Sequence, residues 1–311
     1  MGLALMASAP DEKAKQVPGV VETGSIYEPD FPFRPKFINI AGHRIAYFDE
    51  GIGPLTILMV HGNPVSGYVY TPLMRHLLPD YRCVVPDLMG FGMSDKPVEE
   101  KTYSLPGHIA MMAEFVRRLD LRDLAIIGHD WGGPIGFGAA VEEPERYSHL
   151  IVLNTMTEAP MKILPHYWLP FHILLRMRGL FSYLVRDRGL FQRLGVAIMD
   201  PQDQAVYARA NHDWATRAGI AAFPRLIPHN ESHANYPILK MILAKLESWD
   251  IPALVLFSDH DSVFTAEQGQ RFAERMANAQ YKLIVGPRHF LQYEQPERIG
   301  RLVRDFLGPS I

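Results

Sequence analysis

One acidic residue stands in a position where its type and spacing could do chemistry. Residues 128–132 read Gly-His-Asp-Trp-Gly, after an apolar run at 124–127 and before a helix-like run at 133–143. A strand, a tight turn with flanking glycines and a helix are typical of a nucleophile elbow, which presents the central residue at the end of a parallel strand. Ser usually occupies that position, and here it is Asp130. The pattern therefore predicts a carboxylate nucleophile.

A carboxylate nucleophile restricts the substrates that can react. Asp130 is ionised near neutral pH, so it needs no base to remove a proton before it attacks. It can displace a leaving group from a saturated carbon or open an epoxide. With an amide or an ordinary ester it would form a mixed anhydride, which expels the carboxylate again. The simpler interpretation is that Asp130 caps the following helix, at ~1 kcal/mol, but glycines on both sides favour the nucleophile.

A water-activating histidine is expected after the elbow. Folds that use such an elbow place an acid and then the histidine later in the chain. Of the thirteen histidines, His289 directly follows the last predicted strand, residues 281–285, and precedes the last predicted helix. We therefore expect His289 to act as the general base.

The acid that orients this histidine is expected after the strand at residues 253–257. The segment 258–261 reads Ser-Asp-His-Asp, and Asp261 takes the usual position of the acid, with Asp259 as the alternative. The strand that follows the elbow ends in Asn154 and offers no carboxylate. Asp261 would then stabilise the imidazolium of the base.

Two further residues could donate hydrogen bonds to a leaving group. Displacement at a saturated carbon releases an anion, so donors are needed for that anion besides the backbone donors for later ester hydrolysis. Trp131 carries an indole N–H, and Asn63, in the His-Gly-Asn-Pro turn at 61–64, carries an amide. The simpler roles are a core residue and a turn former. Together with Asp130 they predict a halide clamp, with the backbone N–H groups of Asn63 and Trp131 as oxyanion donors.

The predicted elements alternate between strands and helices. A hairpin is expected at 37–40 and 43–49, further strands at 56–60, 82–85, 124–127, 150–153, 253–257 and 281–285, and helices at 72–78, 106–119, 133–143, 266–276 and 296–307. Alternation of this kind predicts an α/β fold with a mostly parallel sheet.

The alternation stops between residues 155 and 236, which contain no strong strand candidate and many prolines, aromatics and arginines. We expect this segment to form an inserted helical cap, with a main domain at 31–154 and 237–311 and a flexible leader at 1–30. Cap residues expected to pack on the main domain or to line an apolar pocket are Trp168, Phe171, Leu174, Met177 and Phe191.

The composition sets limits on partners. A formal net charge of -3 over 311 residues gives no reason to expect nucleic acid or an anionic membrane as a partner. No run approaches the ~20 apolar residues of a membrane span, and the N-terminus has no positive n-region of a signal peptide. The single cysteine, Cys83, is expected to be buried and fits a reducing cytoplasm. The oligomeric state is left open.

From about residue 37 to 307 the chain resembles the haloalkane dehalogenases of the α/β-hydrolase superfamily. The resemblance rests on the turn at 61–64, residues 86–97, the elbow, residues 223–228 of the cap and residues 286–294 around His289. It implies an α/β-hydrolase fold with a cap and no metal or organic cofactor. It also implies a reaction in which Asp130 displaces halide from a small halogenated hydrocarbon and forms an alkyl-enzyme ester. Asn63 and Trp131 would bind the halide, and water activated by His289 and Asp261 would hydrolyse the ester.

Two other functions remain open. Epoxide hydrolases resemble this chain in the elbow and the cap, but they use two cap tyrosines to polarise the epoxide, and an aromatic usually replaces Asn63. The cap tyrosines here are Tyr167, Tyr183, Tyr207 and Tyr236. If the side chain of Asn63 points away from Asp130, the epoxide interpretation gains. A binding protein on the same fold would be expected to lose a member of the triad, and this chain keeps all three.

Overall fold

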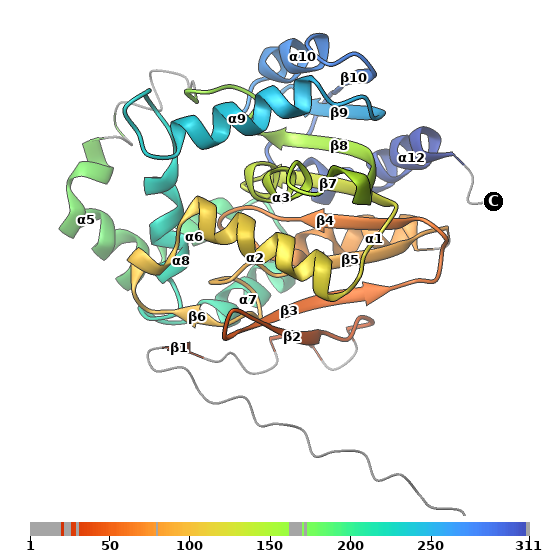
Figure 1. The fold of residues 1–311 in the computed structure, drawn as a ribbon. Helices are drawn as coiled ribbons and strands as arrows, with labels where there is room; N and C mark the ends of the chain where they lie inside the picture. The colour runs from red at the N-terminus through yellow and green to blue at the C-terminus, as the bar shows by residue number, and fades with distance from the viewer. Residues whose placement is uncertain are drawn as a thin grey trace, which may run out of the picture.

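The computed structural model describes residues 20–21, 26–28, 31–78, 80–161, 170 and 173–308. Most of the predicted leader, residues 1–30, lies outside these ranges. The central sheet has eight strands in the order β10-β9-β8-β7-β4-β5-β3-β2 (Figure 1). Its strands are β2 (Lys36–Ile40), β3 (His43–Glu50), β4 (Thr56–Val60), β5 (Arg82–Pro86), β7 (Leu124–Asp130), β8 (Tyr147–Thr155), β9 (Ala253–Ser258) and β10 (Ala279–Ile284).

Strands β10 to β5 in this order pair in parallel, and β3 and β2 continue the sheet in antiparallel register. The prediction of an α/β fold with a mostly parallel sheet is therefore confirmed. The continuous apolar runs of β4, β7 and β9 are buried along their whole length, as strands covered on both faces require. A short second sheet, β1 (Val20–Val21) with β6 (Lys96–Pro97), was not expected from the sequence.

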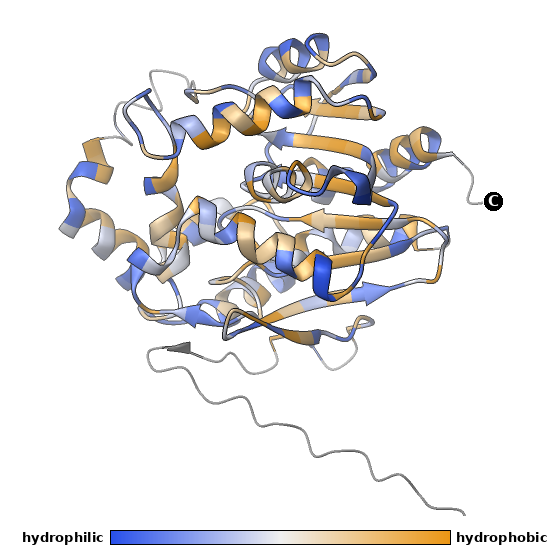
Figure 2. Cartoon of the chain, in the orientation of Figure 1, coloured by the Kyte–Doolittle hydropathy of each residue, from blue (hydrophilic) through white to orange (hydrophobic). Residues whose placement is uncertain are grey.

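Helices cover both faces of the sheet. On one face lie α2 (Leu105–Arg118), α3 (Gly138–Ala140) and α9 (Tyr236–Glu247), and on the other α1 (Thr71–Leu77), α11 (Leu291–Glu294) and α12 (Pro296–Leu307). α10 (Ala266–Glu274) packs against β9 and β10. Alternate residues of β4 enter different cores: Leu58 and Val60 join the first, Ile57 and Met59 the second. Hydropathy colouring shows the orange strands between the two layers (Figure 2).

The helix after the elbow is shorter than expected. Instead of a helix over 133–143, the chain forms the π-helical turn η3 (Gly133–Phe137) and then α3, which ends at Ala140. A Cβ atom at Gly132 would lie 1.8 Å from the carbonyl oxygen of Val60. The start of this helix therefore lies directly against β4, and only glycine allows that approach.

Between residues 173 and 226 the described chain is helical. The segment contains α5 (Arg178–Ser182), η5 (Tyr183–Asp187), α6 (Leu190–Gly195), α7 (Pro201–Ala210), α8 (Ala218–Ala222) and η6 (Phe223–Leu226). Figure 1 shows α5, α6 and α8 beyond the arrowheads of β4 and β8, so the helices cover the carboxyl ends of the parallel strands. We take them as the inserted cap, although the expected boundary residues themselves lie in β8 and at the start of α9.

Cys83 is fully buried in β5, as expected, and burial raises the pKa of its thiol to about 12. Within the described ranges, no helix combines the length and the apolar character that crossing a bilayer demands.

Candidate active site

Asp130 is the last residue of β7 and has the backbone conformation of an elbow. Its φ of 52° lies in the left-handed region, which residues other than glycine rarely adopt. The Thr155 hydroxyl, at the end of the neighbouring strand β8, donates to the carbonyl oxygen of Asp130 at 2.5 Å. The turn is therefore fixed from the adjacent strand, and sequence reasoning did not single out Thr155.

The carboxylate of Asp130 lies among backbone donors. The N–H of Asn63 donates to Oδ1 at 2.8 Å. Gly62 allows this contact, because a Cβ there would lie 2.1 Å from the same oxygen. Burial raises the pKa of Asp130, while His289 and the backbone N–H groups of Trp131 and Asn63 act in the opposite direction. Both expected oxyanion donors thus reach the carboxylate.

His289 bridges two carboxylates. Its Nδ1 donates to Oδ2 of Asp261 at 2.8 Å, and its Nε2 lies 3.9 Å from Oδ2 of Asp130. Burial by itself would lower the pKa of His289, but Asp261 and Asp130 outweigh it and raise the pKa to about 9. The carboxylate of Asp261 is in turn fixed by the N–H of Val263, at 2.7 Å. The histidine is therefore protonated at neutral pH.

The structure brings Asp261, and not Asp259, to the histidine. Asp259 points to the surface, where it pairs with His260 at 2.7 Å and accepts the N–H of Gly286 at 2.8 Å. Asp130, His289 and Asp261 thus meet at the carboxyl ends of β7 and β9 and in the loop after β10.

Two side chains to which the sequence assigned no positioning role fix the backbone of His289. The amide of Asn154, at the end of β8, lies 3.1 Å from the carbonyl oxygens of both Arg288 and His289 and 2.7 Å from Oγ of Ser258. His129 donates from Nε2 to the His289 carbonyl at 2.9 Å, and burial lowers its pKa well below the usual value. Both residues stand at the ends of adjacent parallel strands, and this position was the sequence signal that could have indicated their role.

The turn that carries Asn63 is fixed by a neutral histidine. His61 accepts the N–H of Leu88 at Nε2, at 2.9 Å, and its Nδ1 donates to the carbonyl oxygen of Gly62 at 2.8 Å. Burial lowers the pKa of His61 to about 4. The imidazole therefore stays neutral and orients the loop beside Asp130.

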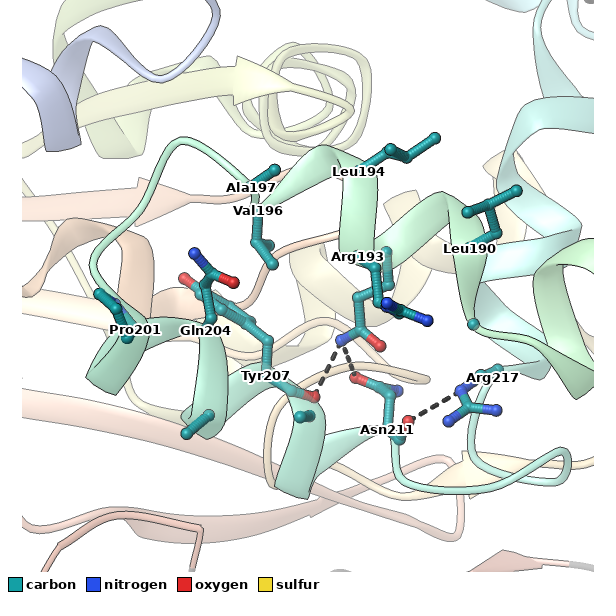
Figure 3. Close-up of a pocket in the computed structure, with 14 residues that line it drawn as sticks. Leu190, Arg193, Leu194, Val196, Ala197, Pro201, Gln204, Tyr207, Asn211 and Arg217 are labelled. Carbon is teal, nitrogen blue, oxygen red and sulfur yellow. Dashed lines mark hydrogen bonds between the residues drawn. The ribbon is translucent and has the colours of Figure 1, made fainter.

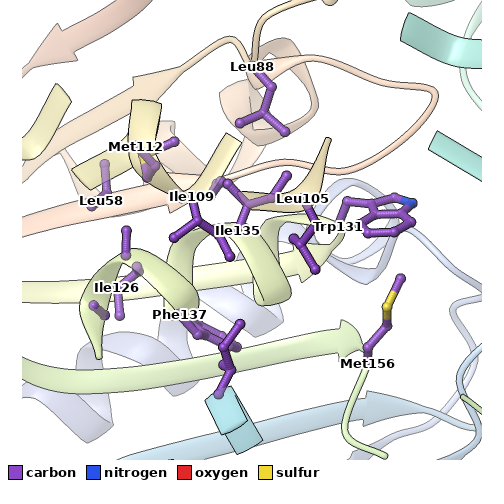
Figure 4. Packing of buried hydrophobic residues seen from close by; sticks show 14 of the residues in the cluster. Leu58, Leu88, Leu105, Ile109, Met112, Ile126, Trp131, Ile135, Phe137 and Met156 are labelled. Carbon is purple, nitrogen blue, oxygen red and sulfur yellow. The ribbon is translucent and has the colours of Figure 1, made fainter. Parts of the chain in front are cut away.

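The side chains of Asn63 and Trp131 both meet the cap. Nδ2 of Asn63 donates to the carbonyl oxygen of Ile220 at 3.4 Å, which leaves one amide hydrogen uncommitted. The Trp131 ring packs edge to face with Phe223 at 5.3 Å and lies at the end of the apolar cluster near Met156 (Figure 4). In the described chain, its indole N–H donates to no protein group. Both side chains are buried and retain a free N–H.

The cap tyrosines give the epoxide interpretation little support. The hydroxyl of Tyr236 donates to Glu231 at 3.3 Å, and Tyr183 is half exposed. Tyr207 is buried against Tyr68, and no protein partner for its hydroxyl occurs among the described residues. Tyr167 lies outside those residues. None of the three described hydroxyls forms a hydrogen bond with Asp130.

A cavity of about 600 Å³ lies within the cap, between α6 and α7 (Figure 3). Two of its polar side chains are already bonded: Nε2 of Gln192 donates to the carbonyl oxygen of Tyr207 at 2.9 Å, and Nε of Arg217 donates to that of Asn211 at 2.9 Å. It includes no residue of the Asp130 centre, so we do not assign it as the substrate pocket.

The expected pocket residues are distributed differently from the prediction. Leu174 and Phe191 pack partly buried against the core, whereas Met177 is 51% exposed, which contradicts its expected packing. Trp168 and Phe171 lie outside the described residues. Within the described chain, no cluster of three His, Cys, Asp or Glu side chains could bind a metal ion.

The sequence of this chain is similar to those of several known proteins. The model of a family described as having the α/β hydrolase fold matches residues 56–183. A cis-3-alkyl-4-alkyloxetan-2-one decarboxylase from Shewanella oneidensis is 28% identical, over 89% of each chain. A haloalkane dehalogenase from Psychrobacter cryohalolentis is 27% identical, over 90% of this chain and 94% of its own.

Solved structures agree on the fold. The crystal structure of a haloalkane dehalogenase from Agrobacterium tumefaciens C58 superposes with a TM-score of 0.81. It is 24% identical, and the match covers 88% of this chain and 96% of that chain. Taken together, the matches show an α/β hydrolase fold, and the chain is similar to haloalkane dehalogenases over most of its length.

Proposed function

We propose that the protein hydrolyses the carbon–halogen bond of haloalkanes through an alkyl ester on Asp130. The arrangement of the Asp130 carboxylate carries this proposal. Oδ1 accepts the Asn63 N–H, while Oδ2 faces His289 at 3.9 Å, beyond hydrogen-bond length, and is free to attack. A carboxylate that reacts with a saturated carbon needs this access and no base.

In the first step, Oδ2 of Asp130 forms a bond to the carbon as the halide leaves with the bonding electrons. The uncommitted N–H groups of Trp131 and Asn63 are the donors available to the departing anion. Both lie on buried side chains, where a hydrogen bond to an anion is stronger than in water.

Ester formation then changes the charge beside His289. One of the two carboxylates that raise its pKa to about 9 becomes neutral, while burial continues to lower the pKa. The imidazolium can therefore release a proton to solvent and act as a base. It takes a proton from the water that attacks the ester carbonyl, and the backbone N–H groups of Asn63 and Trp131 stabilise the oxyanion.

Collapse of this intermediate releases the alcohol and restores the Asp130 carboxylate and the imidazolium. One cycle converts haloalkane and water into alcohol, halide and one proton. The proton that leaves is the one lost by His289 after ester formation, so the charges balance.

The test is to trap the ester. His289→Phe keeps the nucleophile but removes the base, so incubation with 1-bromobutane should release one equivalent of bromide and leave a butyl group on the protein. Intact-mass spectrometry would detect the adduct, and peptide mapping should place it on Asp130. Asp130→Asn is the matched control and should show no adduct. Continuous turnover by His289→Phe would refute the assignment of the base.

A second candidate is opening of a β-lactone, which the Shewanella oneidensis relative favours. Attack of Asp130 on the saturated C4 of an oxetan-2-one would break the C4–O bond and leave a free carboxylate on the former ring. Loss of CO2 would then form the alkene and expel the Asp130 carboxylate, so this reaction uses no water.

The two reactions differ in their need for His289. A cis-3,4-dialkyl oxetan-2-one should still be turned over by His289→Phe, whereas 1-bromobutane should trap that variant. Alkene formation by the wild type without halide release from haloalkanes would favour the lactone. Diol formation from styrene oxide alone would favour the epoxide hydrolase instead.

A further inference from the structure

The loop that carries His289 is held by hydrogen bonds on both sides of its backbone. Its carbonyl groups accept from buried side chains at the ends of β7 and β8. The N–H groups of Arg288 and Phe290, the two neighbours of His289, both donate to the carboxylate of Glu294. Glu294 therefore fixes the chain immediately before and after the candidate base, and the steps of the reaction do not otherwise involve it.

The contacts of Glu294 have the lengths of ordinary N–H···O hydrogen bonds. Its Oε1 accepts the N–H of Arg288 at 3.0 Å and that of Phe290 at 3.2 Å, and Oε2 lies 3.1 Å from the nitrogen of Arg288. Hydrogen bonds to an ionised carboxylate are stronger than those to a neutral oxygen. Because one planar group accepts from residues on both sides, it restricts how the backbone of His289 can turn.

Glu294 acts from an element that is itself well anchored. It is the last residue of α11, whose first residue, Leu291, is fully buried in the second core and accepts the N–H of Gln295 at 3.0 Å. At the other end of the loop, Nε2 of Gln295 and Nη1 of Arg298 donate to the carbonyl oxygen of Val285 at 3.1 and 3.2 Å. The loop is therefore fastened to the helices that follow it at both ends.

A simpler role for Glu294 is to cap α11. The N–H of Phe290, the N-cap residue of this helix, is a group that a capping carboxylate accepts. The N–H of Arg288 lies two residues before the N-cap residue and outside the helix, yet it is within reach of both carboxylate oxygens and forms the shorter contacts. Capping thus explains one contact of Glu294 and leaves the other two unexplained.

The charge of Glu294 also acts on the imidazolium. Burial lowers the pKa of His289, Asp261 and Asp130 raise it, and Glu294 adds a smaller contribution in the same direction, so that the pKa is about 9. Asp130 loses its charge when the ester forms, whereas Glu294 keeps its own because it takes no part in bond formation. Its effect on the pKa of His289 therefore lasts through the cycle.

We propose that Glu294 is a positioning residue for His289 and that it acts by accepting the N–H groups of Arg288 and Phe290. These contacts fix the direction from which the imidazole approaches the water and the ester on Asp130. The inference rests on the proposed function, since it needs His289 as the base of ester hydrolysis. It assigns Glu294 no part in halide displacement, which requires no base.

Two conservative variants separate reach from charge. Glu294→Asp keeps the charge but shortens the side chain by one methylene, which withdraws the oxygens from the two N–H groups. Glu294→Gln removes the charge but keeps Oε1, which alone accepts from both of them. Glu297→Asp is the matched control, because Glu297 is exposed in the first turn of α12 and forms no hydrogen bond or ion pair in the described chain.

Rapid-quench measurement with 1-bromobutane gives the kinetic test. Ester hydrolysis should slow roughly tenfold in Glu294→Asp, as expected when an outer partner of a functional histidine is lost. Glu294→Gln should retain most of the rate, and its hydrolysis should extend to lower pH, because one of the charges that raise the pKa of His289 is gone. The halide burst should persist in both variants, and Glu297→Asp should behave as the wild type.

NMR of histidine-labelled protein tests the same contacts without any substrate. The proton on Nδ1 of His289, in its 2.8 Å hydrogen bond to Asp261, should give a downfield resonance that exchanges slowly with water. This resonance should be lost through faster exchange in Glu294→Asp and should persist in Glu294→Gln and Glu297→Asp. A helix cap without influence on His289 would leave it unchanged in all three variants.

The outcomes separate this inference from the proposed function. If the wild type released no halide from haloalkanes, the proposed function would fail, while the NMR comparison would still decide the role of Glu294. Normal hydrolysis and an unchanged Nδ1 proton in Glu294→Asp would overturn the inference alone. So would a loss in Glu294→Gln as large as that in Glu294→Asp, because charge would then matter and reach would not. Loss of the halide burst in Glu294→Asp would show a general effect on the fold and would also overturn it.

Discussion

The two halves of the candidate site are attached to the molecule in different ways. The half on the sheet depends on buried hydrogen bonds to the backbone: Thr155 donates to the carbonyl of Asp130, and Asn154 and His129 donate to that of His289. These donors lie at the ends of β7 and β8 and are fully buried. Hydrogen bonds that water does not reach keep the reacting groups in a narrow range of positions.

The cap, in contrast, adds partly exposed charged pairs to its buried apolar contacts, such as those of Phe223 with Phe91 and Trp131. Glu100, in η2 (Glu100–Thr102), accepts from Arg186 and Arg225 of the cap. Asp203 of α7 accepts from the hydroxyls of Tyr68 and Tyr293 in the main domain, at 2.7 and 2.5 Å. Glu100 is partly exposed, so water and salt screen its pairs.

This difference indicates which parts of the molecule are expected to be rigid and which are expected to move. The chemistry requires the nucleophile, base and oxyanion donors in fixed geometry. Substrate entry requires that the covering helices can separate from the sheet. Changes on the sheet side should therefore alter the chemical steps, and changes at the cap contacts should alter stability and substrate entry.

The largest expected effect is at Asp261. Asp261→Asn keeps an acceptor for Nδ1 of His289 but removes the charge that stabilises the imidazolium. We expect ester hydrolysis to slow roughly 10⁴-fold, as for the same exchange in other triads, while the initial burst of halide persists. Rapid-quench measurement of halide and alcohol would separate the two steps. Equal loss of burst and steady state would show that Asp261 acts on the nucleophile or the fold instead.

The second prediction concerns the titration of two adjacent histidines. The rings of His129 and His289 are 4.7 Å apart, yet burial lowers the pKa of His129 while Asp261 and Asp130 raise that of His289 to about 9. Histidine-labelled NMR should show His289 protonated at neutral pH and His129 neutral. In Asp261→Asn the pKa of His289 should fall.

The same shift predicts how stability depends on pH. The folded pKa of His289 is above the unfolded value of ~6.5, so its contribution is complete below that pH and is lost as pH rises toward 9. Denaturant unfolding from pH 6.5 to 9 should show a steeper decline in wild type than in His289→Phe. Parallel declines would contradict the raised pKa.

The sheet-side half of the molecule was the more predictable from sequence. Strands buried on both faces leave continuous apolar runs, so β4 and β9 were located within one residue. The elbow has a short local signature, and the geometry brings Asp130, His289 and Asp261 together. The length of the helix after the elbow was overestimated. The close approach of Gly132 to Val60 is a tertiary contact, and the spacing of apolar residues in the sequence does not reveal it.

The cap was less predictable for a physical reason. Its short helices have apolar residues on several sides, and the sequence does not show which side meets the main domain. Met177 was therefore expected inside and is exposed. The role of Asn154 was missed in a related way, because its partners are the carbonyls of a loop more than a hundred residues later.

Asn154 provides a smaller test of the sheet-side contacts. Asn154→Ala removes the donor to the Arg288 and His289 carbonyls but leaves that of His129. We expect hydrolysis of the ester to slow roughly tenfold, as for partners that orient a functional histidine, with the halide burst retained. A burst of full amplitude would exclude general misfolding. An unchanged hydrolysis rate would show that His129 alone suffices.

The smallest effect is expected at the cap contact of Glu100. Glu100→Gln removes the charge that pairs with Arg186 and Arg225, and since the site is partly exposed we expect a melting temperature lower by about 2 °C, more at low salt than at high salt. Glu145→Gln is the matched control, because Glu145 is exposed and forms no ion pair in the described chain. The rate of ester hydrolysis should be unchanged in both variants, while the rate of halide burst should change only in Glu100→Gln. A slower hydrolysis step in Glu100→Gln would mean that the cap also positions the triad, and the division between a rigid sheet edge and a separable cap would then fail.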